Sequence, residues 1–366
     1  MNQIIDKVSS PNRAFNFSAG PSMLPDSVLL KAQSELLDYQ GSGMSIMEVS
    51  HRGGLFSSVQ QQLEADLTEL LDIPEGYRIL LMHGGSQSQF SMIPLNFSNG
   101  VGAPVYIETG HWGRTAIKAA KQYVDPSVIQ QLQTVTAPAS GWQVPKDAAY
   151  TYYVDNETVN GIEFVAPVDV DDVPTIVDMS SNFLSRPIDL PDYGMVFACA
   201  QKNLGIAGVT VVVVSEALLD RVPLAITPPL YNYNEVLSKQ SVPNTPATFS
   251  WYMMALVLQW IKAEGGLAVM DQRAQQRAAL LYDFIDQSSL YTAAVEKASR
   301  SRMNINFSLN NQELEKLFLN QAELSGLTHL KGHKSVGGCR ASLYNSMPMS
   351  GVEALVTFMQ DFENRA

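Results

Sequence analysis

The sequence predicts an α/β protein with a mainly parallel sheet in a large domain and a smaller α+β domain after it. Short apolar runs alternate with segments of helical length, a rhythm typical of a parallel sheet with helices on both faces. The 366 residues also exceed the roughly 250 to 300 that a single core accommodates. We expect the large domain at residues 16–264 and the small domain at 265–366, completed by residues 1–15.

Six apolar runs are predicted to be buried strands of the large sheet, because each is short, rich in β-branched or aromatic residues and bounded by turn formers. They are 77–82, 103–108, 150–155, 175–179, 195–200 and 209–214. Residues 89–95, 112–122 and 251–264 have helical length and pattern, and Gly265 and Gly266 mark a helix end. In the small domain, 303–309 is predicted to be a strand.

Residues 230–250 are rich in turn formers and predict a long surface excursion that carries function.

The composition of the chain limits what the function of the protein can be. With 24 basic and 36 acidic residues, the formal charge of −12 disfavours nucleic acid and anionic membranes as partners. The two cysteines, Cys199 and Cys339, provide neither a disulfide framework nor metal spacing, and no apolar stretch reaches about 18 residues. We therefore expect a soluble cytoplasmic protein without a metal.

Lys202 stands where an apolar strand ends, in the segment MVFACAQKNLG. An ammonium group at such a place is partly desolvated, which lowers its pKa and favours a Schiff base with an aldehyde cofactor. A lysine that simply ends a strand in water explains this segment alone equally well. Asp178 ends another apolar strand, and a carboxylate there could keep a pyridine nitrogen protonated. A turn or N-cap aspartate is its ordinary alternative, but the pair together favours the cofactor.

Two further segments suit an aromatic phosphate ester. The segment HGGSQSQF at 83–90 joins a strand to a helix and presents backbone N–H groups at a helix N-terminus, where phosphate binds. It is not a Walker loop, and an ordinary strand-to-helix turn explains it almost as well. Trp112, in ETGHWGR, follows a strand and could stack on a ring, although core burial is its usual role.

Several ordered blocks together resemble the phosphoserine aminotransferase family, within the class V pyridoxal-phosphate-dependent aminotransferases. The resemblance covers nearly the whole chain and is far more specific than any single block. The blocks are NFSAGPSMLP (16–25), SIMEVSHRG (45–53), GGSQSQF (84–90), TGHWG (109–113), NETVNG (156–161), DMSSNFLSRP (178–187), AQKNLG (200–205), PNTPATFS (243–250) and GHKSVGGCRASLYN (332–345).

The resemblance implies a fold-type-I transferase with a seven-stranded sheet, which binds pyridoxal phosphate and forms a homodimer with shared active sites. It implies that Lys202 binds the cofactor covalently and carries the proton, and that Asp178 pairs with the pyridine nitrogen. The other implied cofactor contacts are Trp112 to the ring, Thr158 to the ring hydroxyl, and Ser86, Gln87, Gln201 and the partner subunit's Asn244 and Thr245 to the phosphate. The implied substrate contacts are Arg340 to the carboxylate and His51, Arg52, His333 and Lys334 to the phosphate.

Three residues depart from the pattern that the resemblance implies. Gln87 stands where arginine is frequent, Ser88 where glycine is common, and Lys334 where arginine is frequent. Lysine neutralises phosphate but lacks a bidentate fork, so these changes concern phosphate contacts and not the reaction class. Two alternative functions stay open at this point. One is a serine or alanine transaminase acting with glyoxylate, and the other is a non-catalytic protein that binds a phosphorylated metabolite.

Overall fold

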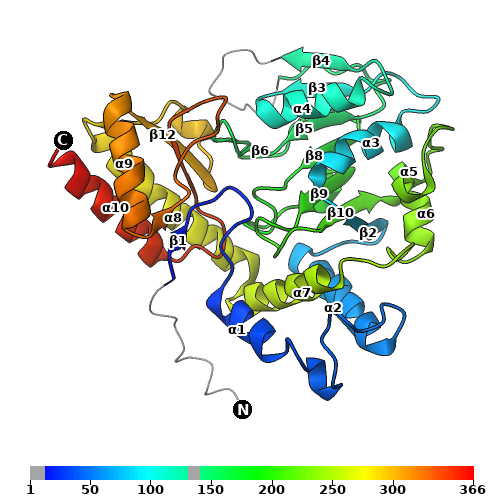
Figure 1. The fold of residues 1–366 in the computed structure, drawn as a ribbon. Helices are drawn as coiled ribbons and strands as arrows, with labels where there is room; N and C mark the ends of the chain where they lie inside the picture. Colours follow the sequence, from blue (N-terminus) through cyan, green and yellow to red (C-terminus); the bar gives the residue numbers. More distant parts are fainter. Residues whose placement is uncertain (1–12, 131–140) are drawn as a thin grey trace.

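A computed structural model describes residues 13–130 and 141–366, and within these ranges seven strands form one large sheet (Figure 1). The strand order is β2-β10-β9-β8-β5-β3-β4. The seven strands are β2 (Tyr77–His83), β3 (Val105–Glu108), β4 (Ser127–Gln130), β5 (Thr151–Val154), β8 (Thr175–Asp178), β9 (Met195–Cys199) and β10 (Val209–Ser215). The predicted seven-stranded sheet is therefore confirmed.

Five neighbouring strands of the sheet, from β9 to β4, pair in parallel, whereas β10 runs antiparallel to both β9 and β2. The six strands expected from apolar runs are all present, with ends that differ by no more than a few residues. The apolar pattern missed β4. Its sequence, SVIQ, is short and half polar, and its place depends on parallel pairing with β3.

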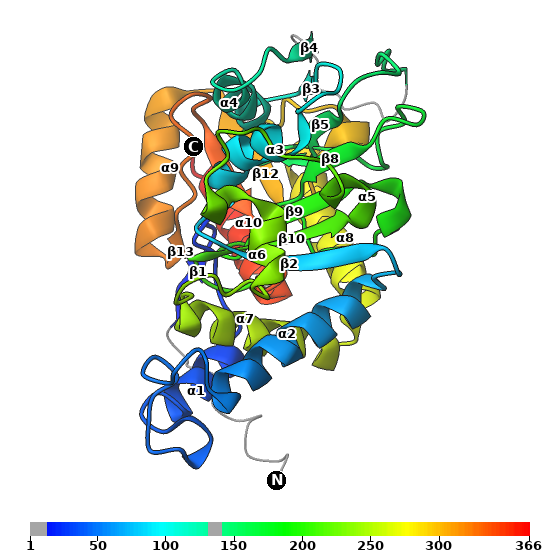
Figure 2. The same cartoon turned by 90° about the vertical axis from the view of Figure 1, so that its right-hand side faces the viewer.

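Helices cover both faces of the sheet because alternate side chains of each buried strand point to opposite faces. Along β10, Val209, Val211 and Val213 enter one apolar core, whereas Val212 and Val214 enter the other. Helices α2 and α7 lie over the first face, and Figure 2 shows them side by side. The helices of this part are α1 (Asp26–Ser34), α2 (Gly54–Leu71), α3 (Gln89–Phe97), α4 (His111–Ala120), α5 (Glu216–Leu219), α6 (Tyr233–Ser238) and α7 (Thr248–Ala263).

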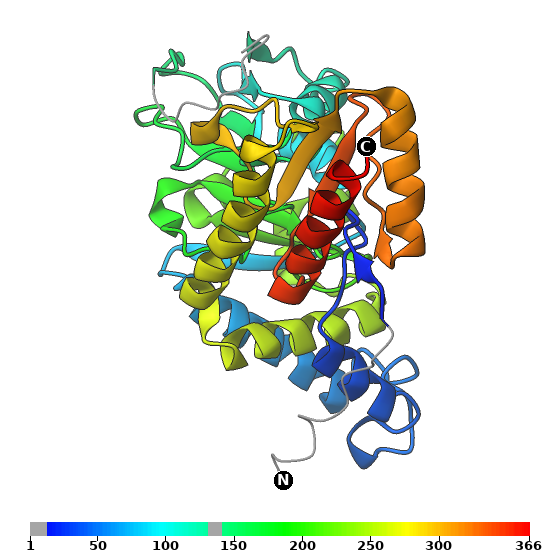
Figure 3. The ribbon, with the colours of Figure 1, turned by 90° about the vertical axis from the view of Figure 1, so that its left-hand side faces the viewer.

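The remainder of the chain builds a third apolar core between helices and small strands. Figure 3 shows α8 and α10 side by side, and the two helices pack against each other. The elements are α8 (Gly266–Gln287), β11 (Tyr291–Thr292), β12 (Asn304–Leu309), α9 (Gln312–Leu324), β13 (Leu327–Thr328), β14 (Cys339–Ser342) and α10 (Met349–Glu363). Strand β1 (Phe15–Asn16) pairs with β13, so the N-terminal segment reaches this part of the molecule.

The proposed domain boundary at residues 264 and 265 coincides with a bend of 83° between α7 and α8. Gly265 has φ of 108°, a backbone conformation that glycine adopts without strain and that lets α7 end there. However, Leu267 and Met270 at the start of α8 belong to the core of the large sheet. The division remains a proposal, and residues 1–12 of the expected N-terminal contribution lie outside the described residues.

Residues 230–250 do not form a purely superficial excursion, so this expectation is partly wrong. Helix α6 lies within the segment, and its Tyr233 and Val236 are buried in the core of the sheet's second face. Turn formers misled the prediction because Asn232 acts as the helix N-cap, accepting hydrogen bonds from two backbone N–H groups. Residues 243–245, nearer the start of α7, are partly or fully exposed.

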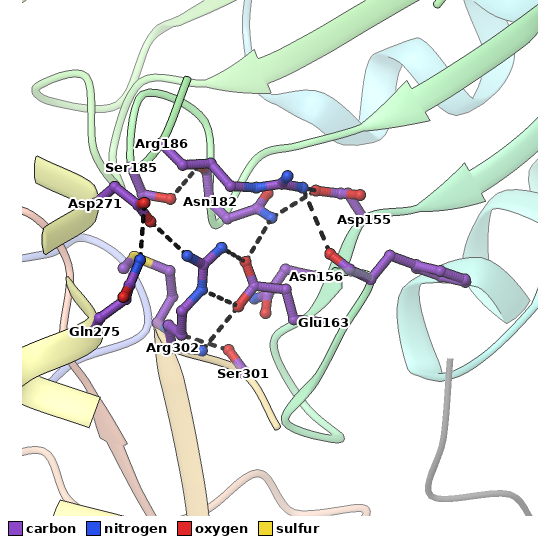
Figure 4. Close-up of polar contacts among 12 residues, drawn as sticks. Asp155, Asn156, Glu163, Asn182, Ser185, Arg186, Asp271, Gln275, Ser301 and Arg302 are labelled. Atoms are coloured by element: carbon purple, nitrogen blue, oxygen red, sulfur yellow. Dashed lines mark hydrogen bonds and ion pairs between the residues drawn. The ribbon is translucent and has the colours of Figure 1, made fainter. Parts of the chain in front are cut away.

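A network of ion pairs connects the small domain to the loops beside the large sheet (Figure 4). Arg302 pairs with Glu163 at the end of β7 (Ile162–Glu163) at 2.8 Å and with Asp271 of α8 at 2.5 Å. Strand β7 pairs with β6 (Asn156–Glu157), which follows β5 directly. Glu163 is buried, so the ion pair stabilises a junction that solvent hardly reaches.

No single helix in the described ranges is long and apolar enough to cross a membrane; α7 and α8 pass a test of length and composition only when taken together across their bend.

Candidate active site

A cavity of about 500 Å³ opens at the carboxyl ends of β5, β8 and β9, where ligands of parallel sheets usually bind. Nine of the residues predicted to be functional line this cavity, although they come from segments far apart in the sequence. They are Ser86, Gln87, Trp112, Thr158, Asp178, Gln201, Lys202, His333 and Arg340.

Lys202 follows β9 and is partly buried at the centre of this group. Its Nζ donates a hydrogen bond to Thr158 Oγ1 at 3.2 Å. Burial lowers the pKa of Lys202, but Tyr344, Cys199 and Asp178 together outweigh burial and raise it above its ordinary value. The expected lowering of this pKa is therefore wrong, because electrostatic interactions with Tyr344, Cys199 and Asp178 together favour the protonated form of Lys202.

Asp178 ends β8 and is 5 % exposed. Burial raises the pKa of its carboxyl group, although Lys202 and hydrogen bonds from Ser180 act in the opposite direction. The backbone N–H of Ser180 donates to Asp178 Oδ1 at 2.8 Å, and the Ser180 hydroxyl lies 2.6 Å from that of Ser86. Lys202 does not fully offset the effect of burial on Asp178, so this carboxyl group is suited to a cationic ligand.

Trp112 is in the first turn of α4, and the position of that turn depends on Glu157. The fully buried Glu157 carboxylate accepts the backbone N–H of Trp112 at 3.0 Å and that of Gly113 at 2.8 Å. Burial raises the pKa of Glu157 to about 7, although these two hydrogen bonds lower it. At Gly110, a Cβ would lie 2.5 Å from side-chain atoms of both Glu157 and Asn160, so only glycine fits this turn.

Glu157 and Ser180 are functional candidates that the sequence reasoning missed. Both lie in blocks already singled out, NETVNG and DMSSNFLSRP, but their neighbours Thr158 and Asp178 received the roles. The available signal was an acid directly after a buried strand with no cation near it in sequence. That signal could not identify Trp112 and Gly113 as the hydrogen-bond donors to Glu157, since they lie more than forty residues away in the sequence.

Arg340 and His333 reach the cavity from the part of the chain after α8. Arg340 lies on β14, and its Nε is buried with no hydrogen-bond partner in the described part of the chain. Burial lowers the Arg340 pKa, with Tyr344 acting in the opposite direction. His333 approaches the ring of His111, at the start of α4, with 4.9 Å between the ring centroids. The cavity is therefore lined by residues from both sides of the proposed domain boundary.

Five predicted residues do not line the cavity within the described part of a single chain. His51 and Arg52 precede α2, Asn244 and Thr245 precede α7, and Lys334 is exposed beside His333. Arg52, Asn244 and Thr245 are likewise exposed. One chain thus brings together the predicted ring contacts, but only part of the predicted phosphate contacts.

The lining residues fit an aromatic aldehyde that bears a phosphate group. Trp112 Nε1 and Gln201 Oε1 are buried at the cavity and, like Arg340 Nε, have no partner in the described chain. Such groups are costly to leave unpaired, so a polar ligand is the natural partner. The cavity also offers an amine at Lys202, an acid at Asp178 and an indole at Trp112. No group of three or more His, Cys, Asp or Glu residues suited to a metal occurs in the described ranges.

Comparisons with known proteins show the family to which the chain belongs. The chain matches the family "Aminotransferase class-V" over residues 14–355. It is 48% identical over 358 residues to a phosphoserine aminotransferase of Coxiella burnetii, covering 97% of this chain and 99% of that protein. It is also similar to the solved phosphoserine aminotransferase of Bacillus circulans subsp. alkalophilus, with a TM-score of 0.93 and 45% identity over 96% of this chain and 99% of that one.

A second solved structure, the pyridoxal-phosphate-bound phosphoserine aminotransferase of Trichomonas vaginalis, has a TM-score of 0.89 and 40% identity, covering 95% of this chain and 100% of that chain. The family match and these relatives each extend over nearly the whole chain, including every block that lines the cavity. The chain therefore belongs to the class-V aminotransferase family.

Proposed function

We propose that the chain is a phosphoserine aminotransferase, which reversibly transfers an amino group between glutamate and 3-phosphohydroxypyruvate in serine biosynthesis. The observation that carries this proposal is the convergence of Lys202, Asp178 and Trp112 with Arg340 and His333 in one cavity. Relatives that are nearly half identical bear this name. We further infer that the protein acts in the cytoplasm, since Cys199 and Cys339 are both free and buried.

Pyridoxal phosphate, when bound, supplies an aldehyde that takes up the amino group and a ring that withdraws electrons from the reacting carbon. Lys202 would hold the aldehyde and would move a proton at its Nζ, which Thr158 orients. Asp178, from its buried position, would keep the ring nitrogen protonated. Trp112 would contact the ring, and Ser86, Gln87 and Gln201, which line the same cavity, would hold the phosphate.

The substrate contacts distinguish this function from its closest rival, a serine or alanine transaminase that uses glyoxylate. In our proposal Arg340 receives the substrate carboxylate, and His333, Lys334, His51 and Arg52 receive its phosphate. A substrate without phosphate would need far fewer cations in a chain whose formal charge is −12. This cation count favours the phosphorylated substrate.

A comparison of two substrates tests this function directly. Glutamate-dependent turnover is measured with 3-phosphohydroxypyruvate and with its dephosphorylated analogue, hydroxypyruvate. We expect kcat/KM to favour the phosphorylated substrate by at least about a hundredfold, since losing a charge-assisted contact costs roughly 1.5 to 3 kcal/mol and several such contacts would be lost. Equal kcat/KM values for the two substrates would instead support the glyoxylate-type transaminase.

We propose that two chains form a homodimer in which each active site is shared. The proposal is supported by the position of His51, Arg52, Asn244 and Thr245 outside the cavity of their own chain, on loops with exposed side chains. The loop before α2 also exposes apolar side chains, including Leu37 at 86 % and Met47 at 53 %. Exposed apolar groups beside functional cations are typical of a surface that another chain covers.

Mixing two inactive variants tests the shared site. Lys202→Ala and Arg52→Ala are combined under conditions of subunit exchange. A mixed dimer then has one site with both lesions and one with neither. Activity should return to about one quarter of wild type, because random exchange makes about half of the dimers mixed. Exchange is verified with differently tagged chains; absence of recovery despite exchange would place Arg52 at its own chain's site.

Glu157 is proposed to position Trp112 for the cofactor ring. In Glu157→Ala, the backbone N–H groups of Trp112 and Gly113 lose their acceptor, at a cost of about 1–3 kcal/mol for a buried donor. We expect pyridoxal phosphate affinity, measured by equilibrium titration, to fall at least about tenfold. Glu157→Gln keeps one acceptor oxygen and should lose less. Unchanged affinity in the alanine variant, with the fold verified by circular dichroism, would show that α4 needs no such anchor.

A further inference from the structure

A second cavity, of about 400 Å³, lies where α7, α8 and the segment before α10 meet. Its charged lining residues are Glu264, Arg273 and Arg277. Among the described residues, none lines both this cavity and the one that contains Lys202. Arg277 is only 2 % exposed, an extreme degree of burial for an arginine that pairs with no carboxylate among the described residues.

The guanidinium group of Arg277 is only half satisfied by the protein. Its Nη1 donates to the backbone carbonyls of Asn345 at 3.2 Å and Met347 at 2.9 Å. Its Nε and Nη2 are buried and have no hydrogen-bond partner in the described part of the chain. These two nitrogens form one edge of the guanidinium plane, where two parallel N–H groups match the two oxygens of a carboxylate or phosphate.

The charges around Arg277 do not balance. Glu264 is the acidic residue among the described residues that line the cavity, and its carboxylate pairs with Arg273 at 2.7 Å. Burial and then the neighbouring Arg273 charge lower the pKa of Arg277 to about 10, so the group still carries its charge at neutral pH. A buried cation without a counter-ion is unfavourable, and an anion from solution would remove that penalty.

We propose that this cavity binds a small anion with a carboxylate or phosphate group, held bidentately by Nε and Nη2 of Arg277. Arg273 adds a second positive charge, and Glu264 competes with the ligand for it. Nε and Nη2 of Arg277 are buried, so the ligand reaches them when side chains that line the cavity move. Arg273, whose side chain is 40% exposed, moves once its ion pair with Glu264 is broken.

A chain of hydrogen bonds connects this cavity to the active site. Arg277 holds the carbonyl of Asn345, and the backbone N–H of Asn345 donates to Asn203 Oδ1 at 2.9 Å. Asn203 directly follows Lys202 in the chain. An anion that orders Arg277 therefore also orders the segment that supports the backbone next to Lys202.

Trp260 lines the cavity and provides the readout for an experiment. The holoenzyme is titrated with inorganic phosphate and, separately, with acetate, and tryptophan emission is followed against chloride at matched ionic strength. We expect a saturable change that chloride does not produce, that Trp112→Phe retains and that Trp260→Phe loses. A response to phosphate alone or to acetate alone supports the site and identifies its ligand class.

Two variants that keep the fold make the test decisive. Arg277→Lys retains a cation that can reach the two carbonyls but lacks the paired N–H edge, and it should raise the dissociation constant at least about tenfold. Glu264→Gln frees Arg273 and should tighten binding several-fold. Chloride acting as well as phosphate and acetate, or an unchanged dissociation constant in Arg277→Lys, would overturn the proposal.

Discussion

Replacing Lys202 by alanine is expected to lower amino transfer by more than about a thousandfold, because one side chain both holds the cofactor and moves the proton. Lys202 is the one lysine among the described residues that line the cavity, and these residues offer no other amine for either task. Steady-state turnover with glutamate and phosphohydroxypyruvate measures the loss. The absorbance of the bound cofactor reports independently whether the covalent attachment is gone.

The fold should tolerate this change, since Lys202 is partly exposed and among the described residues its Nζ donates one hydrogen bond, to Thr158. Urea unfolding should therefore give a free energy within about 1 kcal/mol of wild type. Lys146→Ala, at an exposed lysine far from the cavity lining, is the matched control and should keep full activity. Turnover near the wild-type rate in folded Lys202→Ala protein would end the catalytic assignment.

Asp178→Asn should slow the half-reaction with glutamate by about two to three orders of magnitude while leaving the shape of the site intact. The amide is nearly isosteric and can still accept the N–H of Ser180, but it carries no charge to keep the ring nitrogen protonated. Because Asp178 is 5 % exposed, water cannot substitute for that charge. Stopped-flow absorbance in single-turnover conditions measures the rate.

The control for Asp178→Asn is the same substitution at an acidic residue whose charge is already screened by solvent. Asp169 is exposed and lies before the same strand, β8, so Asp169→Asn removes an equal charge without touching the cavity. It should leave the single-turnover rate unchanged. If Asp178→Asn behaves like this control, the carboxylate at the end of β8 has a structural role only.

The strands of the large sheet were predictable because each is a buried apolar run with its own boundary signals, as in VTVVVV at the start of β10. Residues at the ends of such strands, Asp178 and Lys202, were predictable for the same reason, since parallel strands bring their carboxyl ends together. Strand β4 was missed because half of its residues are polar and only pairing with β3 defines it.

What the sequence could not supply were contacts between distant segments. The support of Trp112 by Glu157 crosses from β6 to α4, and the raised pKa of Lys202 depends on Tyr344, Cys199 and Asp178 facing it in space. The cavity around Arg277 had no sequence signal at all, because an arginine on an amphipathic helix is normally solvated. Burial and the absence of a carboxylate partner distinguish it, and both are tertiary properties.

The ion pairs of Arg302 restrict which segments of this chain can be replaced by those of a relative in a chimeric protein. Glu163 belongs to the loops of the large sheet, while Arg302 and Asp271 belong to the segment after α7. A segment after α7 grafted from a relative without a matching arginine would leave Glu163, 2 % exposed, without its ion-pair partner, at a cost of up to about 3–5 kcal/mol. That cost is comparable to the net stability of many whole domains. Recombination at the bend between α7 and α8 therefore keeps this ion pair only when one parent supplies the glutamate before the bend and the other supplies the arginine after it.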